Sequence, residues 1–322
     1  MTEHSTATEL VGRLVAGDRR ALARAISRVE NADPDLPGIM SALASRTGRA
    51  RVVGLTGAPG VGKSTTTDAL TRALRAQGHS VAVLAVDPSS PFSGGALLGD
   101  RIRMQEHAGD RQVYIRSMAS RGHLGGLSWA APHALRVLDA AGFDVILVET
   151  VGVGQAEVEI ARHADTTLVL SAPGMGDGVQ AAKAGVLEVA DLLVVNKADR
   201  EGAHATIREL RQMVSQGSRE EQDWKPRIVS LVAARGEGVD ELVDRITEHE
   251  RYLRDSGMLH RRRRQRAREE IEAIALAGLR TRLGALWDGA QRQAMLDKLA
   301  DQVATGGTDP YTAADTLLAE LS

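Results

Sequence analysis

A glycine-rich segment that ends in lysine and serine stands between an apolar run and a helical pattern. It matches the spacing G-x-x-x-x-G-K-S and runs directly into Thr65; its residues are Gly57, Ala58, Pro59, Gly60, Val61, Gly62, Lys63 and Ser64. Such a loop wraps a polyphosphate with backbone N–H groups, and bulky side chains there would block the approach. We interpret it as a phosphate-binding loop, with Lys63 on the β- and γ-phosphates and the Ser64 hydroxyl on Mg²⁺. The alternative is an ordinary glycine-rich turn.

A second motif, Asn196-Lys197-Ala198-Asp199, follows another apolar run, 196 − 63 = 133 residues after the loop lysine. Guanine presents N1–H and N2–H₂ as adjacent donors, which the Asp199 carboxylate can accept together. Adenine would leave that carboxylate unpaired. The stem of Lys197 can lie along the base, and Asn196 can tie this segment to the phosphate loop. Alone, the tetrapeptide is typical of a polar turn; together with the phosphate loop it predicts guanine selectivity.

The last apolar run ends in Val232-Ala233-Ala234, where a backbone N–H can meet the guanine O6. The common form of this element begins with serine, which Val232 replaces. A backbone contact survives that change, whereas a serine side-chain contact does not.

Three acids follow apolar runs where a magnesium site is expected. Asp87 and Glu149 each end a run, and Asp100 lies in the segment between them. Mg²⁺ takes hard oxygen ligands and keeps several waters, so one or two carboxylates are enough. Gly152 can approach a γ-phosphate through its N–H, which would make the segment after Glu149 a sensor of hydrolysis. The water-positioning residue stays open, with Asp87 and Gln155 as candidates; singly, each acid also fits a turn or cap.

These residues follow short β-branched runs that alternate with helical patterns, which predicts an α/β fold with a doubly wound, mostly parallel sheet. Several runs are continuously apolar, as expected for strands covered on both faces. The seven runs are Arg51–Thr56, Ser80–Val86, Gln112–Ser117, Asp144–Glu149, Thr166–Ser171, Asp191–Val195 and Arg227–Val232.

The two ends of the chain show helical spacing without strand candidates. Leucine and isoleucine recur at Leu10, Leu14, Leu22 and Ile26 before the α/β part, and at Leu276, Leu279, Leu283 and Leu286 after it. The sequence therefore predicts a helical N-terminal extension (residues 1–50), a P-loop domain (51–250) and a helical C-terminal arm that dimerises (251–322).

The composition excludes several classes of protein. The chain has 40 Lys and Arg against 42 Asp and Glu, a formal net charge of −2 and no cysteine. A globally basic nucleic-acid binder, a thiolate nucleophile and a sulfur-ligated metal site are therefore excluded. The basic run Arg261–Arg268 is interpreted as a solvated helix face, so no nucleic-acid partner is expected. The sequence shows neither a signal peptide nor a membrane-spanning run, and a cytoplasmic location is expected.

In their order along the chain, these motifs closely resemble the MeaB/ArgK family of G3E-type P-loop GTPases. The segments that carry the resemblance are Gly57–Ser64, Asp87–Pro91, Asp100, Arg121–Ser128, Glu149–Gln155 and Asn196–Asp199. The resemblance implies a homodimeric GTPase chaperone that guards adenosylcobalamin loading in methylmalonyl-CoA mutase, with GTP or GDP and Mg²⁺ as cofactors.

The resemblance also implies residue roles. Lys63 and Ser64 would bind phosphate and Mg²⁺, with Asp87, Asp100 and Glu149 at the metal and Asp199 at the guanine. The segment from Pro173 through Gly178 to Lys183 would form a mobile loop that relays the nucleotide state to the mutase.

Three other functions fit the sequence less well. A metal-inserting maturation GTPase is disfavoured because the chain has no cysteine and no histidine tract. A ParA-like ATPase is disfavoured by Ala58, where such proteins carry an extra lysine, and by the Asn196–Asp199 motif. The family's older label of arginine or ornithine transport kinase finds no support, since no phosphoacceptor can be identified.

Overall fold

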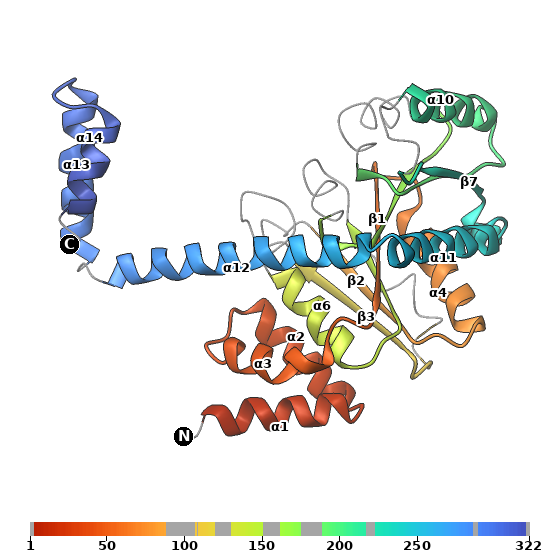
Figure 1. Cartoon of the computed structure of the whole chain (residues 1–322), viewed down its shortest axis with the longest axis horizontal. Helices are drawn as coiled ribbons and strands as arrows, with labels where there is room; N and C mark the ends of the chain where they lie inside the picture. Colours follow the sequence, from red (N-terminus) through yellow and green to blue (C-terminus); the bar gives the residue numbers. More distant parts are fainter. Residues whose placement is uncertain are drawn as a thin grey trace. The chain divides into compact units, whose positions relative to one another are not determined.

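The computed structural model describes residues 3–87, 107, 109–119, 130–150, 162–174, 189–216, 223–285 and 289–319. The chain forms two compact units, Met1–His260 and Arg261–Ser322. The first unit contains a seven-stranded sheet with helices on both faces (Figure 1). Three residues of the predicted site, Asp100, Gly152 and Gln155, lie outside the described residues, as do the segment 121–128 and residues 175–183 of the predicted relay loop.

All seven predicted strands are present, each ending within two residues of its expected bounds. They are β1 (Arg51–Gly57), β2 (Val81–Asp87), β3 (Val113–Ala119), β4 (Val145–Thr150), β5 (Thr166–Ser171), β6 (Leu192–Asn196) and β7 (Arg227–Leu231). Their order is β3-β2-β4-β1-β5-β6-β7, and every pairing between them is parallel. The expected mostly parallel sheet is therefore wholly parallel, and the carboxyl ends of its strands share one edge.

The continuous apolar runs are explained by burial on both faces of the sheet. Along β2, Val81 and Val83 belong to one apolar cluster, while Ala82 and Leu84 belong to the other. Because successive side chains of a strand point to opposite faces, both sets must be apolar. The interior of β5 and β6 is likewise buried throughout.

Each face of the sheet has its own helices. The cluster that contains Val83 is completed by α4 (Lys63–Ala76) and α11 (Val239–Asp255). The cluster that contains Leu84 is completed by α1 (Glu3–Val15), α2 (Arg19–Glu30), α3 (Leu36–Leu43) and α6 (Ala130–Ala140). A third cluster joins α10 (Ala203–Gln216) to β5 and β6.

The N-terminal helices are part of the first unit because their leucine and isoleucine side chains are buried. Leu14 is 1% exposed and Ile26 is 0% exposed, in the same cluster as α6. Asp18 caps α2 by accepting hydrogen bonds from the N–H groups of Arg20 and Ala21. A hydrogen bond from Arg13, together with these backbone bonds, lowers the pKa of Asp18 below its usual range.

The described residues of the second unit form helices, with a short turn at residues 305–309. It holds most of α12 (Met258–Ala285), together with α13 (Gly289–Ala304) and α14 (Pro310–Ala319). Four large apolar side chains in the described part of α12 are at least half exposed in this single chain: Ile271, Ile274, Leu276 and Leu279. None of the helices in the described ranges has the length and apolar character needed to cross a membrane.

Candidate nucleotide site

The phosphate loop connects β1, which ends at Gly57, with α4, which begins at Lys63. Gly62 has φ +97°, and a Cβ there would lie 2.3 Å from the Asn196 side-chain nitrogen. Gly57 has φ +142°, and a Cβ there would lie 2.3 Å from the Leu170 carbonyl oxygen. Both positions therefore require glycine for conformation and for space.

Lys63 lies beneath this loop and is 7% exposed. Its ammonium donates hydrogen bonds to the carbonyl oxygens of Gly57 at 2.6 Å and Ala58 at 3.1 Å. The positive charge is thus held against the loop backbone at the first residue of α4. The partial positive charge of the helix N-terminus adds to it, and the combination suits an anionic phosphate.

Glu149 is a carboxylate at the end of β4 that is 1% exposed. The Ser64 hydroxyl donates to its Oε1 at 2.5 Å, and the Thr67 hydroxyl lies 2.9 Å from its Oε2. When the Ser64 proton points to Glu149, the lone pairs of the same oxygen stay available to a cation. Ser64 and Glu149 thus supply the hard oxygen atoms that Mg²⁺ prefers, and in this respect the site fits the ion.

Asn196 connects three segments that are far apart in the sequence. Its amide nitrogen donates to the Val61 carbonyl in the phosphate loop at 2.8 Å. Its amide oxygen accepts from the backbone N–H of Ala233 at 3.1 Å. Asn196 is 3% exposed, so this side chain holds the phosphate loop, the end of β6 and the turn after β7 in one arrangement.

The two charged residues of the second motif also have partners. The Lys197 ammonium donates to the Gly60 carbonyl at 2.6 Å, and Lys197 itself has φ +57°. The Asp199 carboxylate forms an ion pair with Arg235 at 3.0 Å, and both side chains are about half exposed. Arg235 also pairs with Glu237 at 3.1 Å, so Asp199, which the sequence predicts to recognise the base, lies in a small charged group.

The remaining predicted residues are placed only in part. Asp87 is the last residue of β2, Pro59 and Gly60 are exposed, and Ser64 and Thr65 are half-buried at the start of α4. Val232 forms an isolated antiparallel β-bridge with Glu237. Ala233 and Ala234 lie in a turn of 3-10 helix, η4 (Ala233–Arg235). Among the described residues, no three acids or histidines are grouped to hold a metal ion.

The motifs did not identify Thr67 and Arg235. Thr67 lies one helical turn beyond Lys63, and that spacing is the only signal the sequence carries for it. Arg235 stands next to the predicted base-binding turn, but its pairing with Asp199 depends on how the segment after β7 folds back.

A family model described as methylmalonyl-CoA mutase-associated GTPase MeaB matches residues 22–286 of this sequence. The chain belongs to the MeaB family. This membership confirms the resemblance predicted from the motifs. As a member of the MeaB family, the chain is a P-loop GTPase.

Individual relatives agree with this assignment. A putative GTPase of Pyrococcus horikoshii is 48% identical over 97% of this chain and 98% of its own length. GTPase ArgK of Escherichia coli is 39% identical over 84% of this chain and 83% of its own length. A crystal structure described as an LAO/AO transport system kinase is 29% identical over 98% of each chain, with a TM-score of 0.74. The overall architecture of this MeaB-family chain is therefore that of a solved relative.

Proposed function

We propose that this chain is a magnesium-dependent GTPase chaperone that assists adenosylcobalamin loading and protection of methylmalonyl-CoA mutase. The GTPase activity in this proposal is supported mainly by the two hydrogen bonds of Asn196. Its side chain joins the phosphate loop to the turn after β7. Through it, the segment proposed to recognise the base is joined to the loop proposed to hold the phosphates. The partner rests on the family description, which names the mutase.

In this proposal the phosphate end of the site is built from Lys63, Ser64 and Glu149. Lys63 exchanges its contacts with the loop carbonyls for phosphate oxygens, and backbone N–H groups of Gly57–Thr65 line the rest. Mg²⁺ bound with GTP would neutralise charge on the phosphates. Ser64 would hold that ion directly and Glu149 directly or through Ser64 and water, with Asp87 and Asp100 as further metal residues. Asp87 and Gln155 remain the candidates that orient the attacking water, and Gly152 senses the γ-phosphate.

The base end of the site uses the second motif and the turn after β7. Asp199 accepts from the guanine N1–H and N2–H₂, and the stem of Lys197 covers one face of the base. The N–H of Ala233 is already used by Asn196, which makes the N–H of Ala234 the candidate for O6. Bonding to guanine requires that Arg235 share or release the Asp199 carboxylate.

The helical arm is proposed to join two copies of the chain. The exposed apolar side chains of α12 are the support for this, since an unpartnered apolar face on a helix is costly in water. In this division residues 1–50 form an N-terminal extension, residues 51–250 the GTPase domain and residues 251–322 the arm. Truncation after about Arg254 should give a monomer that still binds GTP.

GTP turnover with and without a cobalamin-dependent mutase tests the proposal. Turnover should be slow alone and should rise when the mutase binds, because a group that accelerates hydrolysis is worth ~10³–10⁵ in rate in other GTPases.

Lys63→Ala should abolish nucleotide binding and every nucleotide-dependent effect on the mutase. Lys183→Ala should bind GTP normally but blunt the stimulation. An unchanged rate at saturating mutase would contradict the chaperone role and leave the GTPase assignment intact.

A further inference from the structure

Three buried threonines of α4 make the same type of local hydrogen bond. The hydroxyls of Thr66, Thr67 and Thr71 each lie within hydrogen-bond distance of the carbonyl oxygen four residues earlier, at 2.9, 3.1 and 2.7 Å. All three are 0% exposed. Of the three, Thr67 has a second acceptor, Oε2 of Glu149, at 2.9 Å. Thr67 therefore differs from Thr66 and Thr71 in its hydrogen bonding, although all three have the same residue type and the same burial.

A threonine hydroxyl carries a single proton, so Thr67 can donate to one of its two acceptors at a time. The carboxylate is the nearer acceptor, and hydrogen bonds to ionised groups are the stronger ones. Glu149 is thereby held at both oxygens, with Ser64 on Oε1 and Thr67 on Oε2. This arrangement orients a carboxylate that is almost fully removed from water.

We propose that Thr67 is a positioning residue for the magnesium site. By holding Oε2 of Glu149, Thr67 keeps Oε1 on the Ser64 proton, an orientation in which the Ser64 oxygen can bind the cation through a lone pair. The inference rests on the proposed GTP and Mg²⁺ binding, and it adds a residue that acts through Glu149 without touching metal or nucleotide. Outer-shell partners of this kind commonly change metal affinity by ~10–100-fold when removed.

The test compares Thr67→Val with Thr71→Val. Both variants replace a buried threonine of α4 with a residue of the same shape, but only the first removes a donor from Glu149. The measurement is binding of a fluorescent GDP analogue as Mg²⁺ is titrated, with a parallel measurement in excess EDTA. Thr67→Val should need about 10-fold more Mg²⁺ for half-maximal effect and bind equally in EDTA. Thr71→Val should match the wild type.

Two further variants test the proposal if the Thr67→Val protein does not fold. Thr67→Ser retains the hydroxyl and should give the wild-type Mg²⁺ titration. Thr67→Ala should need more Mg²⁺ for half-maximal effect, as expected for Thr67→Val. A wild type that binds no guanine nucleotide would overturn the proposed function. A wild type with Mg²⁺-dependent binding that Thr67→Val and Thr67→Ala leave unchanged would overturn the role of Thr67 alone.

Discussion

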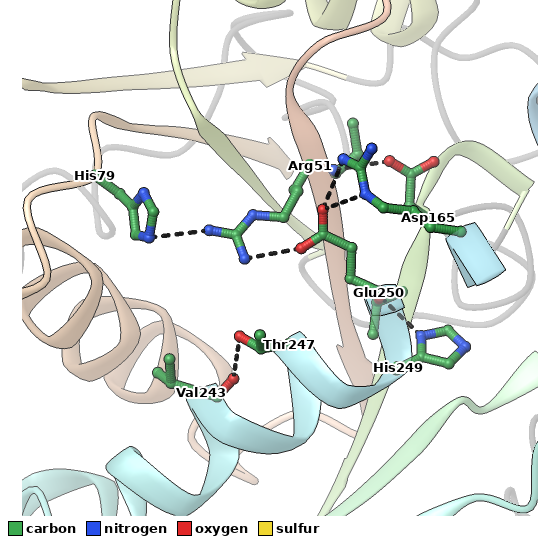
Figure 2. Close-up of polar contacts among 10 residues, drawn as sticks. Arg51, His79, Asp165, Val243, Thr247, His249 and Glu250 are labelled. Atoms are coloured by element: carbon green, nitrogen blue, oxygen red, sulfur yellow. Dashed lines mark hydrogen bonds and ion pairs between the residues drawn. The ribbon is translucent and has the colours of Figure 1, made fainter. Parts of the chain in front are cut away.

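The two ends of the parallel sheet both carry buried polar residues, but they use them differently. At the amino end, Arg51 lies between His79 and Glu250, at 3.2 and 3.0 Å, as Figure 2 shows. Nearby, the buried His249 of α11 has its Nδ1 2.9 Å from the Thr166 hydroxyl and its Nε2 3.3 Å from Asp191. Each of these contacts joins two segments that are distant in the sequence.

At the carboxyl end, the polar side chains converge on one loop. Lys63, Asn196 and Lys197 all donate to backbone carbonyls between Gly57 and Val61. Glycine is required there because a side chain would collide with Asn196 or with β5. Burial of polar groups is common to both ends, so burial does not distinguish a binding site from a structural network. At the carboxyl end the contacts converge on one glycine-rich loop, whereas at the amino end each contact joins two separate segments.

The largest expected effect is at the carboxyl end, for Asp199→Asn. Replacing the carboxylate removes the acceptor for two guanine donors, and GTP affinity should fall at least ~100-fold. Xanthosine triphosphate should gain affinity, because the amide can donate to its 2-oxo group. The melting temperature should change little, since Asp199 is 43% exposed. Equal binding of GTP and ATP by the wild type would contradict the base assignment.

An intermediate effect is expected at the amino end, for His249→Phe. The ring contact with Trp224, whose centroid lies 4.7 Å away, should persist, but the Thr166 hydroxyl loses a hydrogen-bond partner and Asp191 loses a polar neighbour. We expect a loss of roughly 1–2 kcal/mol in the free energy of unfolding, measured by urea denaturation. GDP affinity of the folded fraction should stay within about 2-fold. A marked loss of affinity at unchanged stability would show that the two ends are coupled.

The smallest effect concerns acid sensitivity at the amino end. Burial raises the pKa of Asp144, but hydrogen bonds from the Ser80 N–H and hydroxyl, at 2.7 and 2.8 Å, outweigh it and hold that pKa below its usual value. A lowered carboxyl pKa stabilises the fold above the unfolded-state value and loses that contribution as the pH falls through the folded-state value. Asp144→Asn should therefore be less stable than the wild type at pH 7.

The stability difference between Asp144→Asn and the wild type should begin to shrink below about pH 4, where the carboxyl of the unfolded chain takes up its proton, and should vanish at the lower pH at which the folded-state carboxyl does. Thermal unfolding across pH 3 to 7 measures this. Glu201→Gln, at an exposed carboxylate, serves as the matched control and should show a smaller change with pH. A difference for Asp144→Asn that is constant with pH would show that its charge is not the stabilising feature.

Much of the fold was predictable because the signals are local. The runs that became β1 to β7 are apolar and β-branched, and their helical connections predict parallel pairing. The phosphate loop was equally readable, since the glycine spacing and Lys63 lie within eight consecutive residues. The roles of Thr67, Arg235 and His249 were not readable, because each depends on a partner at least 36 residues away.

The sequence by itself therefore determined the strand and helix pattern, the phosphate loop and the guanine motif, all of which depend on residues that are neighbours along the chain. The sequence also predicted that Asn196 ties its segment to the phosphate loop. Tertiary structure alone decided that its partners are the Val61 carbonyl and the Ala233 N–H, and that Glu149 lies between Ser64 and Thr67. It also decided which buried histidine bridges β5 to α11. The physical reason is that a side chain finds its hydrogen-bond partner only after the sheet has brought distant segments within about 3 Å.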